Sequence, residues 1–111
     1  MRGAVHRLRE DRRAAGHEQR GPRYAVVVHA SRFDHLSRWV VVPTSTSARA
    51  MLVRPEVDWG AGPTRLLCDA LTSIDPLVRL EEMVGYVTTD DQLQIDTALA
   101  LLLDLAPPPG F

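Results

Sequence analysis

A polar loop at residues 16–23 carries the side chains best suited to chemistry. It holds one carboxylate, Glu18, and two guanidinium groups, Arg20 and Arg23, and it runs directly into the apolar stretch 24–28. Charged groups on a loop beside a rigid strand are a common location for binding and catalysis. A guanidinium keeps its charge and offers paired donors to a phosphate, so Arg23 is the first candidate for binding an anionic ligand.

Glu18 has more than one possible role beside Arg23. It can take a proton as a general base, which requires its pKa to rise toward neutrality, or it can orient the guanidinium. A plain surface ion pair between the two side chains is the remaining alternative.

The length and composition define the scaffold that must hold this loop. The chain has 111 residues, enough for one domain (1–111), and its hydrophobic fraction of 45% is ordinary for a globular protein. One cysteine, Cys68, excludes an internal disulfide and fits a reducing compartment. The longest apolar run, 98–103, is too short to cross a bilayer, and the first residues show no signal-peptide pattern. We therefore expect a soluble, cytoplasmic protein.

Charge is divided unevenly along the sequence. All 13 basic residues are arginine, and residues 1–54 carry a net charge of +7 whereas residues 55–111 carry −8. An arginine-rich half favours an anionic partner such as nucleic acid, because guanidinium groups contact phosphates and stack on bases. A mutually neutralised, solvated surface is the alternative.

Two apolar stretches predict central strands of a sheet. Residues 24–29 and 39–42 are continuous apolar runs, and we expect the second strand to stop at Pro43. Weaker strand patterns lie at 2–9 (an edge strand), 51–57, 65–71 (with Cys68 inside) and 82–87. The other segments are a long loop at 10–22, a turn or single helical turn at 31–37, a turn at 58–64, and a stretch at 72–80 that is irregular or briefly helical.

The last part of the chain changes to a helical period. Thr89 is the expected N-cap and Gln92 the N3 residue of a capping box, with two acids in the first turn near the positive end of the helix dipole. The expected apolar face comprises Leu93, Ile95, Leu99, Leu102 and Leu105. Five or six short strands followed by one helix predict a mostly β fold, a small, strongly bent antiparallel barrel with a C-terminal α-helix.

The order of these features resembles the MazF/PemK-type toxins, the mRNA interferases of bacterial toxin–antitoxin systems. The matching motifs are an Arg-Gly pair at 2–3, a Gly-x-Glu-Gln-x-Gly-x-Arg loop at 16–23, a Val-Pro-x-Thr-type element at 42–46, and an acid followed by a Ser-Ile-Asp turn at 69–75. The resemblance implies an SH3-like barrel of the MazF/CcdB/Kid type, a homodimer and a cognate MazE-like antitoxin. It also implies a sequence-specific endoribonuclease that cleaves single-stranded mRNA without a metal or other cofactor, leaving 2′,3′-cyclic phosphate and 5′-OH ends.

Several residues acquire roles through this resemblance. Arg23, Glu18 and the hydroxyls of Ser45 and Thr46 occupy the catalytic positions, and which of the two hydroxyls acts is open. Asp69 matches the general base of one branch of the family, so Glu18 and Asp69 are alternative bases. The substrate-binding residues implied or considered on this basis are His17 (also a candidate acid or base), Gln19, Arg20, Arg49 and Asp69. Trp39 and Trp59 could stack on bases, although packing or a dimer contact is the favoured use.

The alternative function is a catalytically weak or inactive member of the same fold. Ala4, Tyr24 and Ala70 stand where the family often has other residues, which motivates this reading. Such a protein would bind an antitoxin or another target without cutting RNA, so an RNA-cleavage assay distinguishes the two functions.

Overall fold

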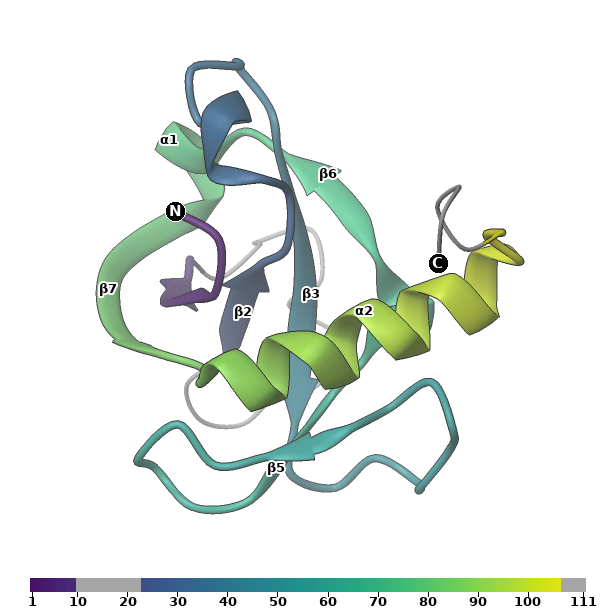
Figure 1. The fold of residues 1–111 in the computed structure, drawn as a ribbon. Helices are drawn as coiled ribbons and strands as arrows, with labels where there is room; N and C mark the ends of the chain where they lie inside the picture. Colours follow the sequence, from purple (N-terminus) through teal and green to yellow (C-terminus); the bar gives the residue numbers. More distant parts are fainter. Residues whose placement is uncertain (10–22, 107–111) are drawn as a thin grey trace, which may run out of the picture.

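Seven strands and one long helix dominate the computed structural model, which describes residues 1–9 and 23–106 (Figure 1). The strands are β1 (Ala4–Leu8), β2 (Tyr24–Val27), β3 (Trp39–Ser45), β4 (Glu56–Val57), β5 (Thr64–Leu66), β6 (Thr72–Ile74) and β7 (Leu80–Tyr86). The helices are α1 (Pro76–Arg79) and α2 (Thr89–Leu103), with 3-10 turns at Ser31–Phe33 and Cys68–Ala70.

The strands among the described residues pair antiparallel. Their order in the sheet is β4-β5-β3-β2-β1-β7, and β6 also pairs with β3. The sheet curls strongly, and α2 lies across it in front of β2 and β3 (Figure 1). The predicted mostly β fold with a C-terminal helix is therefore confirmed.

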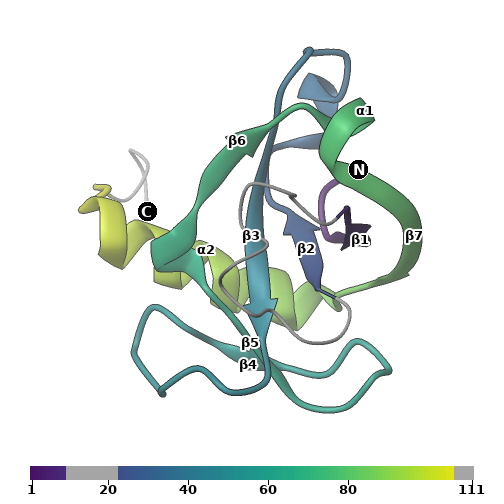
Figure 2. The ribbon, with the colours of Figure 1, turned by 180° about the vertical axis from the view of Figure 1, so that it is seen from behind.

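Strand β2 is buried on both faces, which explains its continuous apolar sequence. Val26 and Val28 pack into a cluster that includes Ile95 of α2, whereas Ala25 and Val27 pack into a second cluster. The antiparallel pairing of β2 with β3 sets Ala25 opposite Pro43. The start of β2 therefore lies beside the end of β3, near β4 and β5 (Figure 2).

Helix α2 begins one residue earlier than the sequence predicted. Thr88, not Thr89, is the N-cap: its Oγ1 accepts from the Asp91 backbone N–H at 3.0 Å, and Asp91 Oδ2 accepts from the Thr88 N–H at 3.1 Å. Each threonine has a residue able to close a capping box three positions later, Asp91 or Gln92, so local sequence did not discriminate between them.

The apolar face of α2 is narrower than predicted. Ile95 and Ala98 are buried against the sheet and Leu99 is partly buried, whereas Leu93, Leu102 and Leu105 are exposed. The prediction was therefore wrong for these three leucines, because helical spacing alone does not tell how much of a helix the sheet covers. Within the described ranges, no helix is long and apolar enough to cross a membrane.

The Arg2-Gly3 pair ties α2 to the sheet. Arg2 forms an ion pair with Asp96 of α2 and donates from Nε to the Val28 carbonyl at 3.2 Å. Gly3 has a φ of 86°, and a Cβ at this position would lie 2.7 Å from Gln92 Nε2. The positive φ favours glycine, whereas the Gln92 amide lies at the end of a flexible side chain that can move aside. The backbone conformation thus gives this motif a structural reason.

Two strand predictions near the centre of the sheet were wrong. β1 is not an edge strand, because it pairs with β2 on one side and β7 on the other, and its residues Ala4 and Val5 are buried. β3 does not stop at Pro43 but continues to Ser45. The carbonyl of Pro43 accepts from the Leu67 N–H at 2.8 Å, so this contact needs no donor from the proline.

The middle of the chain is more irregular than predicted. Of the expected strand 51–57, only Glu56–Val57 is a strand. A turn precedes it, in which the Arg54 N–H donates a hydrogen bond to the Met51 carbonyl. The expected strand 65–71 ends at Leu66, so Cys68 lies in a 3-10 turn. Residues 72–80 contain the short helix α1, which agrees with the briefly helical alternative, and β6, which was not predicted.

Candidate functional site

A polar pocket lies where the start of β2 meets the end of β3. Its volume is about 170 Å³. The lining combines one guanidinium, several hydroxyls and two aromatic rings, from Arg23, Tyr24, Thr44, Ser45, Thr46, Ser47, Trp59, Ala61, Gly62 and Thr64. Three of the predicted catalytic residues, Arg23, Ser45 and Thr46, therefore share one cavity.

Arg23 combines a fixed backbone with an available side chain. Its carbonyl accepts from the Leu8 N–H at 2.8 Å, which holds the residue against β1. The residue is exposed, and no carboxylate within residues 1–9 and 23–106 forms an ion pair with its guanidinium. An anion in the pocket would therefore meet a cation that no described carboxylate neutralises.

The two candidate hydroxyls differ in their surroundings. Ser45 ends β3, and its Oγ accepts from the Ser47 backbone N–H at 3.3 Å. The Ser45 and Ser47 hydroxyl oxygens also lie 3.5 Å apart, and either can donate to the other. When Ser47 donates, the Ser45 hydroxyl hydrogen is available for another acceptor. Thr46 follows the strand and is exposed. Both hydroxyls line the pocket, and the geometry favours Ser45 as a donor to a bound anion.

Asp69 and Arg49 are not among the residues that line this pocket. Arg54 donates to both carboxylate oxygens of Asp69, at 2.9 and 2.8 Å, and also to the Arg49 carbonyl at 3.2 Å. These hydrogen bonds to Arg54 lower the pKa of Asp69. A carboxylate held in this way is a poor proton acceptor near neutral pH.

The Asp69–Arg54 pair predicts an acid-dependent contribution to stability. Because the folded-state pKa of Asp69 is lowered, its contribution is present above the unfolded-state pKa of about 3.9 and is lost as the pH falls through the folded-state value. The difference in unfolding free energy between wild type and Asp69→Asn should therefore be measurable at pH 7 and shrink below about pH 4. Urea titrations across this range measure it. Glu82→Gln, at an exposed carboxylate of β7, is the control, and equal pH dependence of both variants would contradict the assignment.

Four predicted residues lie outside the described residues. His17, Glu18, Gln19 and Arg20 belong to the segment 10–22, so the structure does not test their placement.

The pocket also contains Trp59, for which the sequence left base stacking and packing as alternatives, and Tyr24 and Thr64, for which no site role was predicted. Thr64 is 6% exposed, and its Oγ1 has no hydrogen-bond partner within the described part of the chain. Tyr24 and Trp59 meet edge to face, with ring centroids 5.0 Å apart. A tryptophan in a glycine-rich turn was the available signal, but its partners come from strands remote in sequence.

The structure separates Cys68 and Trp39 from the pocket. Cys68 is fully buried, and burial raises the pKa of its thiol to about 11, so it stays protonated near neutral pH. Trp39 packs against His6 and His29 and donates from Nε1 to the Asp34 carbonyl at 3.0 Å. In the described ranges, no group of three or more His, Cys, Asp or Glu side chains is placed to hold a metal ion.

Comparisons with known proteins agree with this architecture. A family model described as "PemK-like, MazF-like toxin of type II toxin-antitoxin system" matches residues 1–103. A Mycobacterium tuberculosis (strain ATCC 25618 / H37Rv) protein named "Putative toxin Rv3098A/RVBD_3098A" is 38% identical over 105 residues, which cover 95% of this chain and 98% of that protein.

Two solved structures illustrate the likeness in fold. An endoribonuclease in complex with its cognate antitoxin, from a mycobacterial species, matches with a TM-score of 0.77 and 22% identity, covering 97% of this chain and 98% of its own. MazF from Deinococcus radiodurans matches with a TM-score of 0.75 and 22% identity, covering 94% and 96%. The expected MazF-like barrel is therefore confirmed as the fold.

Proposed function

The chain belongs to the PemK-like, MazF-like toxins of type II toxin–antitoxin systems, and we propose that it is an endoribonuclease that cuts single-stranded mRNA without a metal ion. The observation that carries this proposal is the shared pocket of Arg23, Ser45 and Thr46. A phosphodiester is an anion with several acceptor oxygens, so a guanidinium that no described carboxylate neutralises, beside hydroxyl donors, suits it.

In the proposed reaction, the ribose 2′-oxygen attacks the adjacent phosphorus. Glu18 takes the 2′-OH proton as the O2′–P bond forms, and Arg23 stabilises the extra negative charge on the phosphorane oxygens. The P–O5′ bond then breaks, and the leaving oxygen takes a proton from an acid, for which His17 is the candidate. The products are a 2′,3′-cyclic phosphate and a 5′-OH end. We assign the base to Glu18 rather than Asp69, because Arg54 engages both Asp69 oxygens.

The remaining parts of the proposal concern binding and partners. The proposed substrate contacts are Gln19, Arg20, Arg49 and Asp69. Of these, Arg49 and Asp69 would contact parts of the RNA that lie outside the pocket. The likeness to an endoribonuclease bound to its cognate antitoxin supports a MazE-like antitoxin as partner. We also propose a homodimer in the cytoplasm, with residues 1–111 as one domain and cleavage restricted to a short RNA sequence.

An RNA-cleavage assay with the purified protein tests this function directly. The protein should cut single-stranded RNA in excess chelator, and mapping of the RNA ends should give 2′,3′-cyclic phosphate and 5′-OH groups at a recurring sequence. Tight antitoxin binding without RNA cleavage would instead identify a non-catalytic binding module of the same fold.

Substitution of the two hydroxyl residues should distinguish their roles. Ser45→Ala should lower the cleavage rate by about 10- to 100-fold, the effect of losing one hydrogen bond to a charged group. Thr46→Val should change the rate by less than about 5-fold, because no described residue fixes its hydroxyl as the Ser47 N–H fixes that of Ser45. Single-turnover rates on a defined RNA measure both, and the reverse order of effects would reassign the donor to Thr46.

A further inference from the structure

Trp59 forms one aromatic wall of the pocket, and two contacts hold it there. Its ring meets Tyr24 of β2 at an interplanar angle of 65°. It also lies on Gly85 of β7, where an added Cβ would be 3.1 Å from Trp59 Cε3. Glycine at this position thus makes room for the indole. A half-buried ring supported from two strands is a preformed surface rather than a loosely placed side chain.

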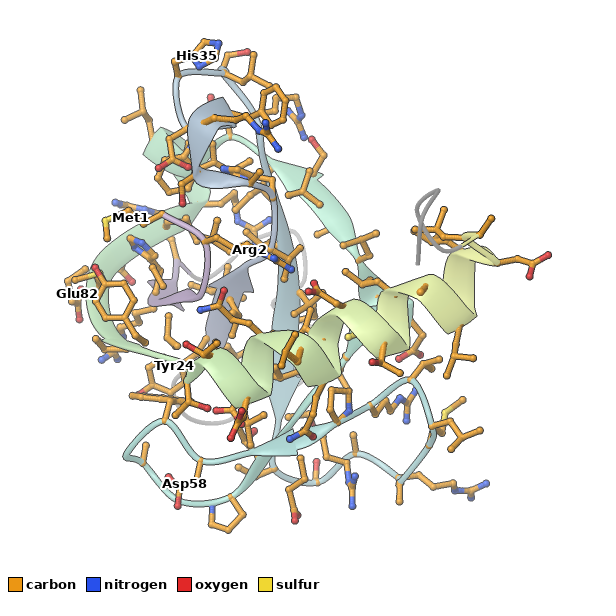
Figure 3. All side chains as sticks on the ribbon, viewed as in Figure 1. Met1, Arg2, Tyr24, His35, Asp58 and Glu82 are labelled. Carbon is orange, nitrogen blue, oxygen red and sulfur yellow. The ribbon has the colours of Figure 1, made fainter. Side chains whose placement is uncertain are left out.

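The loop that carries Trp59 is itself organised by one carboxylate. Asp58 Oδ1 accepts from the Gly60 N–H at 2.9 Å and from the Gly62 N–H at 3.1 Å, which closes the turn between β4 and β5. Figure 3 shows Asp58 on this turn, below Tyr24 in that view. The Tyr24–Trp59 contact therefore joins the turn to the start of β2, directly after Arg23.

The same pocket thus offers two kinds of recognition. Arg23 and Ser45 suit a phosphate, whereas Trp59 presents an aromatic surface on which a planar ring can stack. The volume of about 170 Å³ is below that of typical drug-sized sites, so it suits one ring system better than several nucleotides. Hydroxyls of Thr46 and Ser47 are available to the polar edge of such a ring.

We propose that Trp59, braced by Tyr24, is the stacking platform for one unpaired nucleobase adjacent to the phosphate held by Arg23. This inference rests on the proposed ribonuclease function and adds a residue that binds the base rather than the reacting atoms. Stacking tolerates every base, and the hydroxyl-lined edge supplies the preference among them.

Tryptophan fluorescence measures the contact without requiring cleavage. The chain has two tryptophans, so in Trp39→Phe the remaining emission comes from Trp59. The four nucleoside 3′-monophosphates, titrated separately, should quench it. Trp59→Ala should weaken their binding by about 5- to 150-fold, whereas Trp59→Phe should retain most of it and Trp39→Phe should leave the Kd unchanged. Calorimetry supplies the Kd for all the variants.

An abasic scan of the RNA supplies a second test that does not depend on how the variants fold. The probe is the mapped cleavage sequence with 2′-deoxy sugars, so that it binds without being cut. Removing one base should weaken binding to the wild type but have no further effect in Trp59→Ala, which identifies the stacked base. If the effects of base removal and of Trp59→Ala were additive at every position while the wild type still cut RNA, the base platform would be overturned. The ribonuclease function would then still stand. Quenching by nucleotides without any RNA cleavage would support the platform and overturn the ribonuclease function.

Discussion

Arg23→Ala should lower the rate of RNA cleavage by about 100- to 1,000-fold, which is the usual cost of losing one preorganised donor to a developing anion. The structure supports this expectation because the guanidinium lines the pocket beside Ser45, and its backbone is held by Leu8. The transition state carries more negative charge on the phosphate oxygens than the ground state does. The loss should therefore appear mainly in kcat, with a smaller change in KM.

Arg32→Ala is the matched control, because it removes the same charge from an exposed residue that does not line the pocket. Its rate should stay within about 3-fold of wild type, as expected for a screened surface charge. Arg23→Lys should recover part of the activity, since it keeps the charge but loses the paired donors. Multiple-turnover kinetics on a labelled RNA measure all three variants. Equal rates for wild type and Arg23→Ala would remove Arg23 from the mechanism.

Leu66→Ala should destabilise the fold by about 2–5 kcal/mol, the usual cost of truncating a buried leucine. Leu66 is 0% exposed, and it pairs with Thr44 across the β3–β5 ladder. A cavity here removes packing directly beneath the strands that carry the pocket hydroxyls. Because domains of this size are stable by only about 5–15 kcal/mol, the variant should lose a large share of its stability.

Urea unfolding measures this loss as a shift in midpoint at an unchanged slope. Leu77→Ala is the matched control, because Leu77 of α1 is 89% exposed and its truncation should cost less than about 0.5 kcal/mol. Similar midpoint shifts for the two leucine variants would show that β5 is not part of the cooperative core.

Several features of this protein could be predicted from the residues themselves. β2 was predicted because Ala25, Val26 and Val27 are apolar without alternation, and the structure buries both faces of that strand. α2 was predicted because its caps and apolar period are local. The bounds of the short strands β4 and β6 could not be predicted, because two or three residues give no period to detect.

The site was predictable in part, for the same reason. Arg23 was chosen as a guanidinium next to an apolar run, whereas Ser45 and Thr46 took their role from the family resemblance. Antiparallel pairing of β2 with β3 brings the three residues together. Asp69 was also chosen, but its side chain is engaged by Arg54, a partner that no local pattern indicates.

The sequence by itself determined the apolar strands, the capped helix and the ordered motifs of a toxin family, because each depends on residues close together in the chain. Both tryptophans pack against core clusters, and only the tertiary structure decided that Trp59 also lines the pocket while Trp39 does not. The two tryptophans have the same chemistry, and what separates them is strand register: β7 presents Gly85 to Trp59, and β2 presents Tyr24. Contacts of this kind depend on how the whole sheet closes, and hydrophobic periodicity carries no information about it.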